Sequence, residues 1–300
     1  MTIWTSPIPA PGGSRIDATR DDDAVARERE HYDEHKRYIL HFLERDRAPF
    51  ERFILRRTLR TWDRHVAFLD RSWFAGRRVV EVGCGNPRHL SMFLAWGASS
   101  VVGVDLSEAF VRRGLAHPTA YVYDQSMPTR GEDMELRFGD FCGEAGKGLA
   151  ADTICCFQSL HHIDLPRFAA TCGRVVGPGG VVAISDPVGD HPLRRLGNAV
   201  GRWSGLLSDD ERALPAARVA EEFGRHGFER ILFRSLNPTT EIYFHLTELV
   251  TPLSPTLAIA LKTPLAPWRI VEDWIETRIL PRHPRWGWRY LSVFRKGGTP

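Results

Sequence analysis

The stretch RVVEVGCGNPRHLSMFLAWGASSVVGVDLS, residues 78–107, decides the fold class of this 300-residue chain. An apolar run at Val79–Val82 breaks at Gly83 and Gly85, a helical segment follows, and a second apolar run ends in Asp105. This order predicts a βαβ unit, because parallel strands need a crossover connection. The glycines let the backbone approach a ligand, and an acid about 20 residues on can bind ribose hydroxyls. The unit therefore indicates a site for an adenosine-containing cofactor.

The composition of the chain excludes several classes of protein. Hydrophobic residues make up 43% and charged residues 26%, which is typical of a globular protein that buries a sizeable core. The net charge of +3 is small for this length, so nucleic acid is not an expected partner. The five cysteines include no Cys-x-x-Cys pair, so we expect reduced thiols and a cytoplasmic location. No Cys/His spacing predicts a metal site.

The chain divides into four parts. Residues 1–20 lack the apolar core of a signal peptide and are expected to form a flexible tail. Apolar residues at helical spacing predict a helical lid over 21–75. The cofactor-binding core should span 76–236, and 237–300 should hold a helical insertion and the closing strand of the core. Within that last part, four prolines interrupt Leu249–Trp268, so no transmembrane helix is expected.

Strand and helix patterns alternate from residue 78 onward. They predict a doubly wound, mostly parallel seven-stranded α/β sheet, with the helical insertion before the last strand. The expected strands are Val79–Val82, Ser100–Val104, Met134–Phe138, Thr153–Phe157, Val181–Ser185, Arg230–Arg234 and Tyr290–Phe294. The expected helices of the alternating core are Pro87–Trp96, Ser107–Leu115, Leu165–Val176 and Pro215–His226.

The glycine turn distinguishes between adenosine cofactors. A dinucleotide-binding enzyme would usually have a third glycine where Arg88 stands, so a nicotinamide oxidoreductase is disfavoured. The turn instead resembles the first motif of class I S-adenosylmethionine-dependent methyltransferases. It matches that motif at Glu81, Gly83 and Gly85, and it has Pro87 in place of the last glycine.

Later segments resemble the same family in order. VVGVDLS places Asp105 at the ribose position with Leu106 beside it, and RFGDFCGE places Asp140 and Phe141 where the family holds adenine. ADTICCFQSLHHI, which contains Phe157, resembles the fourth strand and its loop, and GRVVGPGGVVAISDP resembles the turn into the fifth strand. The resemblance implies a Rossmann-like fold that binds S-adenosylmethionine as methyl donor. It implies a cofactor site formed by Glu81, Gly83, Cys84, Gly85, Asp105, Leu106, Asp140, Phe141 and Phe157.

Candidate catalytic residues follow the fourth and fifth strands, since ligands bind at the carboxyl ends of parallel strands. These candidates are His161, His162 and Asp186. A general base is needed only if the acceptor loses a proton, and a histidine pair can equally consist of one packed and one solvated ring. Tyr32 and Tyr38 lie on the expected lid, where they would close over the cofactor or pack on the sheet.

The acceptor site should come from the inserted segments, because the core motifs bind the cofactor. Apolar residues across 237–285 would wall a pocket for a small or lipid-like acceptor, contact a membrane surface or a second subunit of a homodimer, or simply cover the sheet edge. Arginines in 191–213 are compatible with an anionic acceptor or with solvated side chains. We therefore expect a methyltransferase acting at oxygen. C- or N-methylation and a cofactor-binding scaffold without chemistry stay open as alternatives.

Overall fold

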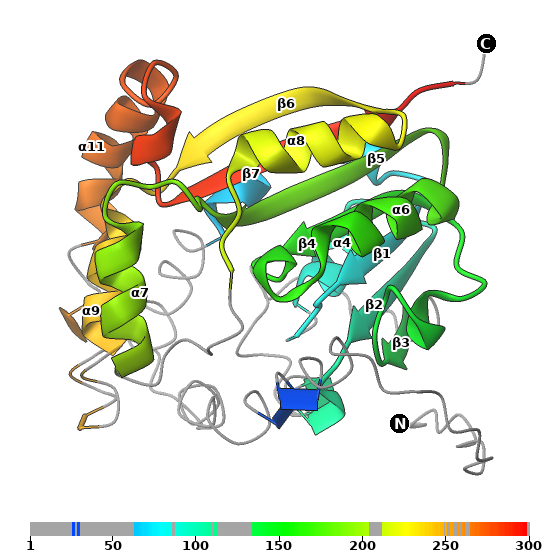
Figure 1. The fold of residues 1–300 in the computed structure, drawn as a ribbon, viewed down its shortest axis with the longest axis horizontal. Helices are drawn as coiled ribbons and strands as arrows, with labels where there is room; N and C mark the ends of the chain where they lie inside the picture. The colour runs from blue at the N-terminus through cyan, green and yellow to red at the C-terminus, as the bar shows by residue number, and fades with distance from the viewer. Residues whose placement is uncertain are drawn as a thin grey trace.

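A computed structural model describes residues 26–27, 29–30, 63–85, 88–109, 111–112, 134–203, 212–248, 250, 253–254, 257, 260–261 and 265–298. They form a seven-stranded sheet with strand order β3-β2-β1-β4-β5-β7-β6. The expected fold class, a Rossmann-like doubly wound sheet, is confirmed (Figure 1). The expected tail, Tyr32, Tyr38 and Pro87 lie outside the described residues.

All seven expected strands are present. Strands β1 to β5 pair in parallel in the order of the sheet, whereas β7 runs antiparallel between β5 and β6. Strand β5 begins five residues earlier than expected, because Val176 already pairs with Ala151 ahead of an irregularity in the register. The strands are β1 (Arg78–Val82), β2 (Ser100–Asp105), β3 (Met134–Phe138), β4 (Ala151–Phe157), β5 (Val176–Pro187), β6 (Phe228–Leu236) and β7 (Arg289–Lys296).

Two groups of helices surround the sheet. Helices α4 (Arg88–Ala95), α6 (Leu165–Val175) and α8 (Ala216–Arg225) cover its faces and match three of the four expected core helices. The fourth, Ser107–Leu115, lies largely outside the described residues.

Three more helices lie together at the end of the sheet where β6 terminates (Figure 1). They are α7 (Arg194–Trp203), α9 (Thr240–Glu248) and α11 (Leu265–Arg278).

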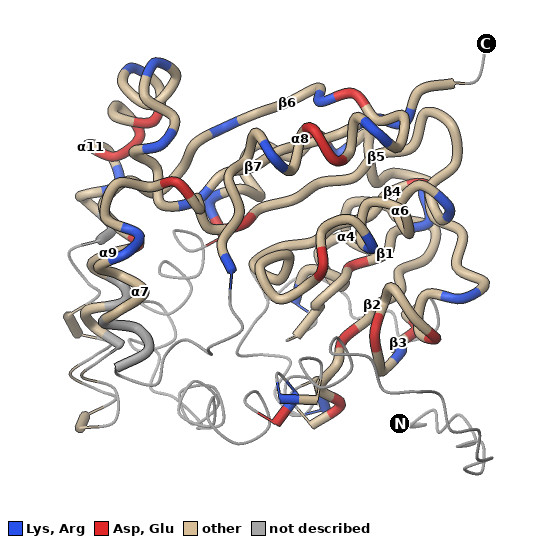
Figure 2. The backbone as a smooth tube through the Cα atoms, in the orientation of Figure 1, with Lys and Arg blue, Asp and Glu red and all other residues tan. Residues whose placement is uncertain are grey.

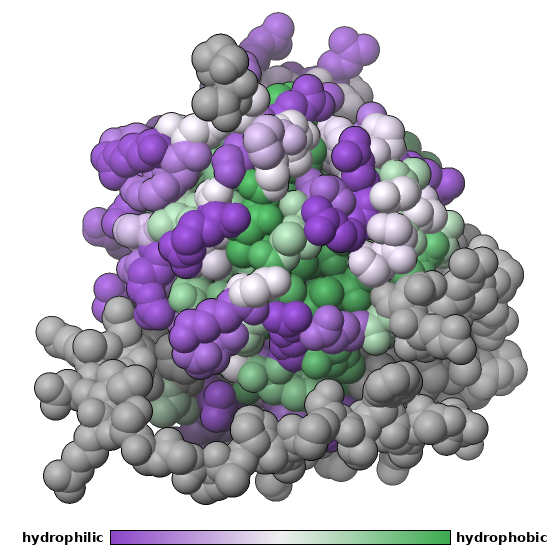
Figure 3. Space-filling view, turned by 90° about the vertical axis from the view of Figure 1, so that its right-hand side faces the viewer, coloured by the Kyte–Doolittle hydropathy of each residue, from purple (hydrophilic) through white to green (hydrophobic). Residues whose placement is uncertain are grey.

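Basic and acidic residues are interspersed along α8 and α11 (Figure 2). At the other end of the molecule, hydrophilic side chains lie beside hydrophobic ones (Figure 3). No helix in the described parts of the chain is long and apolar enough to cross a membrane.

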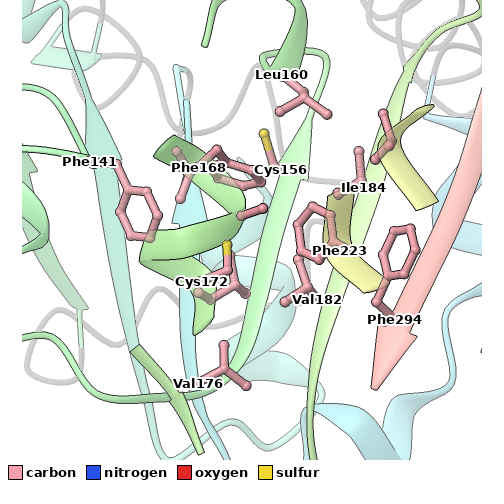
Figure 4. Packing of buried hydrophobic residues seen from close by; sticks show 14 of the residues in the cluster. Phe141, Cys156, Leu160, Phe168, Cys172, Val176, Val182, Ile184, Phe223 and Phe294 are labelled. Carbon is pink, nitrogen blue, oxygen red and sulfur yellow. The ribbon is translucent and has the colours of Figure 1, made fainter. Parts of the chain in front are cut away.

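Two hydrophobic clusters lie on opposite faces of the sheet, because successive side chains of a strand point in opposite directions. Along β4, Ile154 and Cys156 belong to the cluster with α6 and α8, whereas Cys155 and Phe157 belong to the cluster with α4. Figure 4 shows the first cluster, in which Phe223 of α8 stacks on Phe294 of β7. All five cysteines are free, as expected, and burial raises the pKa of the three thiols in β4 and α6 well above the ordinary value.

A buried carboxylate of α11 holds the start of α9. Glu272 accepts hydrogen bonds from the backbone N–H groups of Thr239 (3.0 Å) and Thr240 (2.8 Å) and from both of their hydroxyls. Arg269 balances its charge at 2.7 Å. Since the first N–H groups of a helix have no partner within the helix, Glu272 acts as the cap of α9.

The segment ahead of β1 is bonded to the same insertion. Glu276 of α11 accepts hydrogen bonds from Arg64 (3.0 Å), Arg269 (2.7 Å) and the backbone N–H of Asn237 (2.9 Å). Arg64 also contacts Asp273 at 2.6 Å. Helix α11 is thus fixed both to α9 and to the chain that precedes the first strand.

Substitution of Glu272 tests this anchoring. Glu272→Ala should lower the free energy of unfolding by about 3 kcal/mol, because it leaves the buried donors of Thr239 and Thr240 without their acceptor and removes one of the carboxylates bound to Arg269. Glu221→Ala, which removes an exposed ion pair with Arg225 on α8, should change it by less than about 1 kcal/mol. Urea titrations measure both variants, and equal losses would contradict the capping role.

Candidate active site

The glycine turn after β1 is enclosed by the ends of β2 and β4. Gly83 has φ 67° and Gly85 has φ 47°, in the left-handed region that glycine adopts without strain. Gly83 also has no space for a side chain, because an added Cβ would lie 2.1 Å from Ser159 Oγ. Ser159 Oγ in turn donates a hydrogen bond to the Gly83 carbonyl at 3.2 Å. The turn therefore needs glycine for its backbone angles and for close packing.

Asp105 fixes the same turn from the end of β2. Its two carboxylate oxygens accept hydrogen bonds from the backbone N–H of Gly85 (2.7 Å) and of Ser107 (2.8 Å). The expected role of Asp105 and of the half-buried Leu106 beside it toward the cofactor ribose stays a prediction. The Cys84 side chain is buried and its backbone N–H donates to the Val104 carbonyl at 3.2 Å, so its contact with the cofactor stays a prediction.

The expected adenine site lies after β3. Asp140 is bonded to Arg167 (3.0 Å) and accepts a hydrogen bond from the backbone N–H of Cys142 (2.8 Å). The Phe141 ring is buried in the core, with its centroid 5.7 Å from that of Phe168. The loop is therefore well ordered by these contacts, and the roles of Asp140 and Phe141 toward adenine stay predictions.

Glu81, the acid of the first motif, belongs to a buried ion network. One of its oxygens contacts His89 Nδ1 at 2.6 Å, and His89 Nε2 lies 3.5 Å from Asp63. Asp63 accepts hydrogen bonds from Nε and Nη2 of Arg88, both at 2.9 Å. Burial alone would raise the pKa of Asp63, but Arg88 and His89 outweigh it and hold that pKa far below its ordinary value. Burial lowers the pKa of His89, and Glu81 and Asp63 reverse this to a net increase.

This network was not expected from the sequence. It explains why an arginine stands at position 88, where a dinucleotide-binding enzyme would have glycine. The Arg88 guanidinium is committed to Asp63 across 25 residues of chain, and its side chain is only 16% exposed. It is therefore poorly placed to bind a cofactor phosphate, which counts further against a nicotinamide dinucleotide. No local pattern marks Asp63, because its partners are distant in the sequence.

His65 lies in the same buried region. Its ring packs against Phe157 at 4.2 Å between centroids, and neither ring nitrogen has a partner among the described residues. The ligand-capable atoms of Asp63, His65 and His89 lie within 4.8 Å of one another. Because Arg88 already neutralises Asp63, this geometry favours an ion network over a metal centre.

The catalytic candidates meet where β4 and β5 end. His161 Nδ1 lies 2.8 Å from Asp186 Oδ1, and the His162 ring lies beside that of His161 at 4.0 Å between centroids. The contact forms because Phe157 and Ser185 are paired neighbours, and Gln158, with φ 59°, turns the chain back over β5.

Tyr290 is a further polar residue of this region that the sequence did not reveal. It lies directly across from Asp186 on β7 and is fully buried. The other Asp186 oxygen and the Tyr290 hydroxyl have no partner within the described parts of the chain. Burial, followed by the Asp186 charge, raises the pKa of Tyr290 well above its ordinary value.

The segment after β5 is packed rather than open. The His191 ring contacts Trp288 at 4.6 Å between centroids, and its Nδ1 accepts a hydrogen bond from the backbone N–H of Leu193. Arg194 lies over the Trp288 ring and donates to the carbonyls of Val188 and Trp288. Arg194 therefore has a structural role, which weakens the case for an anionic acceptor.

Comparison with known proteins identifies the family. Residues 50–232, more than half of the chain, match a methyltransferase domain family, so the protein belongs to that family. A probable S-adenosylmethionine-dependent methyltransferase of Mycolicibacterium smegmatis is 31% identical over 52% of this chain and 53% of that protein. The chain thus spans about half the length of this relative. A ubiquinone biosynthesis O-methyltransferase of Thiobacillus denitrificans is 28% identical over 58% of this chain and 74% of that protein.

The fold also resembles that of a solved structure. Magnesium protoporphyrin IX methyltransferase of Synechocystis PCC 6803, with bound SAH, superimposes with a TM-score of 0.56 at 15% identity, covering 92% of this chain and all of that one. The predicted family is confirmed: the chain belongs to the methyltransferase domain family, and its relative from Mycolicibacterium smegmatis is named as S-adenosylmethionine-dependent. Its predicted cofactor is S-adenosylmethionine, and the glycine turn and the carboxylate of Asp105 fit that cofactor.

Gly83 and Gly76 both have a positive φ, so alanine substitutions at the two positions distinguish the effect of backbone strain from that of a steric clash. Gly83→Ala should weaken binding of S-adenosylhomocysteine at least tenfold, because the new methyl group collides with Ser159 and displaces the turn. Gly76 has φ 70° but nothing within 4 Å of an added Cβ, so Gly76→Ala should leave the affinity unchanged. Calorimetric titration measures both, and equal affinities of the two variants would contradict this account of the turn.

His65 should make stability depend on pH. Burial holds its pKa well below 6.5, so below about pH 6.5 the unfolded chain takes up a proton that the folded protein does not. The free energy of unfolding should therefore fall with decreasing pH by up to about 1.4 kcal/mol per unit more in the wild type than in His65→Phe. Urea titrations between about pH 7 and 5 give both slopes, and identical slopes would show that His65 takes up its proton in the folded protein as well.

Proposed function

We propose that the protein transfers the methyl group of S-adenosylmethionine to an oxygen of a small or lipid-like acceptor, with His161 as general base. The observation that carries this proposal is the 2.8 Å contact between His161 and the fully buried Asp186. Both residues stand at the carboxyl edge of the sheet, next to the strand ends that hold the glycine turn. That edge is where ligands of parallel α/β sheets bind.

The dyad has the chemistry that an oxygen acceptor requires. An ionised carboxylate can only accept a hydrogen bond, so Asp186 places the imidazole proton on Nδ1 and leaves a lone pair on Nε2. Through Nε2, His161 would take the proton of the acceptor hydroxyl, and Asp186 would balance the resulting imidazolium charge. S-adenosylmethionine supplies a methyl group that its sulfonium already activates. The rest of the catalysis would come from alignment and exclusion of water.

The cofactor would lie along the glycine turn. We assign its contacts to the residues expected from the sequence, with the methionine part near Gly83 and Gly85 and the ribose at Asp105. Glu81 has one oxygen committed to His89, so only its other oxygen remains for the cofactor's ammonium group.

Oxygen is favoured over carbon or nitrogen as the acceptor atom for two reasons. A hydroxyl must lose its proton during transfer, and the dyad would accept that proton. The relative from Thiobacillus denitrificans is named as an O-methyltransferase, which supports the same choice. A cofactor-binding scaffold without chemistry would have no use for a buried carboxylate that orients an imidazole.

Removal of the base tests the proposal. His161→Gln should lower kcat by about 10²–10⁴ and leave the affinity for S-adenosylhomocysteine unchanged, because His161 acts on the acceptor. The readout is the release of S-adenosylhomocysteine with a panel of phenols, catechols and aliphatic alcohols. The rise of kcat with pH that a histidine base produces should be absent in the variant. Mass spectrometry and NMR of the product identify the methylated atom.

Asp186→Asn should lower kcat as well, since it removes the negative charge that stabilises the imidazolium. His226→Gln, at the end of α8, is the control and should retain wild-type activity. Full activity of His161→Gln would refute the dyad, and a product methylated at carbon or nitrogen would favour one of the alternatives.

A further inference from the structure

An apolar cavity of about 490 Å³ lies between the loop after β5, helices α9 and α11, and the turn before β7. Its size falls within the range of small-molecule binding sites, about 300–1,000 Å³. Aliphatic and aromatic side chains form most of its wall. They include Leu193, Ile242, Ile275, Ile279 and Trp286, with His191 at one side.

The cavity lies beyond the end of the β5–β7 strand pair that carries Asp186 of the proposed catalytic dyad. On the β5–β7 pair, Asp186 lies across from Tyr290, and Val188 donates to the carbonyl of Trp288 two positions further on. The His191 ring then packs on Trp288 and forms part of the cavity wall. At about 3.4 Å per strand residue, the two positions from Asp186 to Val188 span roughly 7 Å, and the His191 ring lies beyond them.

Apart from His191, Thr239 and His283, the wall of the cavity is apolar. Glu272 and Arg269 hold α9 against α11 at the base of the insertion, so the space between these helices is preformed. His191 is held on both sides by Leu193 and Trp288, and burial together with the nearby Arg194 lowers its pKa, which keeps the ring neutral. A mostly apolar cavity favours an apolar ligand.

We propose that this cavity binds the apolar tail of the acceptor, so that the acceptor is an amphiphile with its reacting oxygen in the head group. This inference rests on the proposed function, because it places the oxygen at His161. The cavity lies beyond the end of the same strand pair that carries Asp186, which argues for a tail of the same molecule over a separate ligand. The acceptor class is then a hydroxylated head group joined to an aliphatic chain.

Binding of a homologous series tests the cavity without relying on turnover. The probes are para-butyl-, para-octyl- and para-dodecylphenol, titrated below their micelle concentrations into the protein saturated with S-adenosylhomocysteine. Affinity should increase about fourfold for each methylene that enters the cavity, once the tail is long enough to reach it. An affinity that does not depend on chain length would overturn the proposal.

A pair of tryptophan substitutions provides the matched control. Ile242→Trp fills the cavity and should abolish the gain with chain length. Ile270→Trp lies on α11 but is 75% exposed and outside the cavity wall, so it should keep the gain. Unchanged S-adenosylhomocysteine affinity in both variants shows that each is folded. Equal losses in the two variants would overturn the proposal.

The outcomes also distinguish this inference from the proposed function. Tail-dependent binding without any methyl transfer would support the cavity and count against phenolic oxygen as the acceptor atom. Methyl transfer that is indifferent to tail length would support the function and overturn the cavity proposal. A dimer that dissociates in Ile242→Trp, with no dependence on chain length, would assign the cavity to a second copy of the chain and would also overturn it.

Discussion

The packing of Ser159 against Gly83 is the constraint on which the site depends. Because no side chain fits at position 83, the loop after β4 rests directly on the glycine turn. The turn is also tied to β2, since Gly83 and Cys84 donate to the Val104 carbonyl and Gly85 donates to Asp105. Three strand ends are thereby fixed to one short loop. A cofactor on this loop would lie next to the segment that carries His161.

A second organising element is the tripeptide Asp63–His65 ahead of β1. Asp63 binds Arg88 and His89 of α4, Arg64 binds Asp273 and Glu276 of α11, and the His65 ring packs on Phe157 at the end of β4. These three residues therefore contact α4 beside the expected cofactor site, α11 of the insertion, and the end of β4. Since α11 also walls the apolar cavity, these contacts join the two halves of the proposed site.

The parts that the sequence predicted correctly are those with local patterns. Apolar runs of strand length located all seven strands, and the glycine turn with Asp105 identified the first βαβ unit. His161 and Asp186 were selected only because they follow strands four and five, and the parallel pairing of β4 with β5 brings them together.

Other features depend on contacts between distant segments, so no local pattern reveals them. Asp63 meets Arg88 and His89 only after the chain has folded, and the early start of β5 depends on the pairing of Val176 with Ala151. The cavity is similar, because its wall combines residues from 191 to 286. The packing of the Phe141 ring against Phe168 is a contact of the same kind, and the role of Phe141 toward adenine stays a prediction.

The central claim is that the carboxyl edge of this sheet is an S-adenosylmethionine site organised by the glycine turn and Asp105. Calorimetric titration with S-adenosylhomocysteine tests it most directly. We expect one binding site per chain with micromolar or tighter affinity, weakened about tenfold or more in Asp105→Ala, since a buried or charged hydrogen-bond partner contributes about 1–3 kcal/mol. The absence of binding at high micromolar concentration, or an affinity that Asp105→Ala leaves unchanged, would contradict the account.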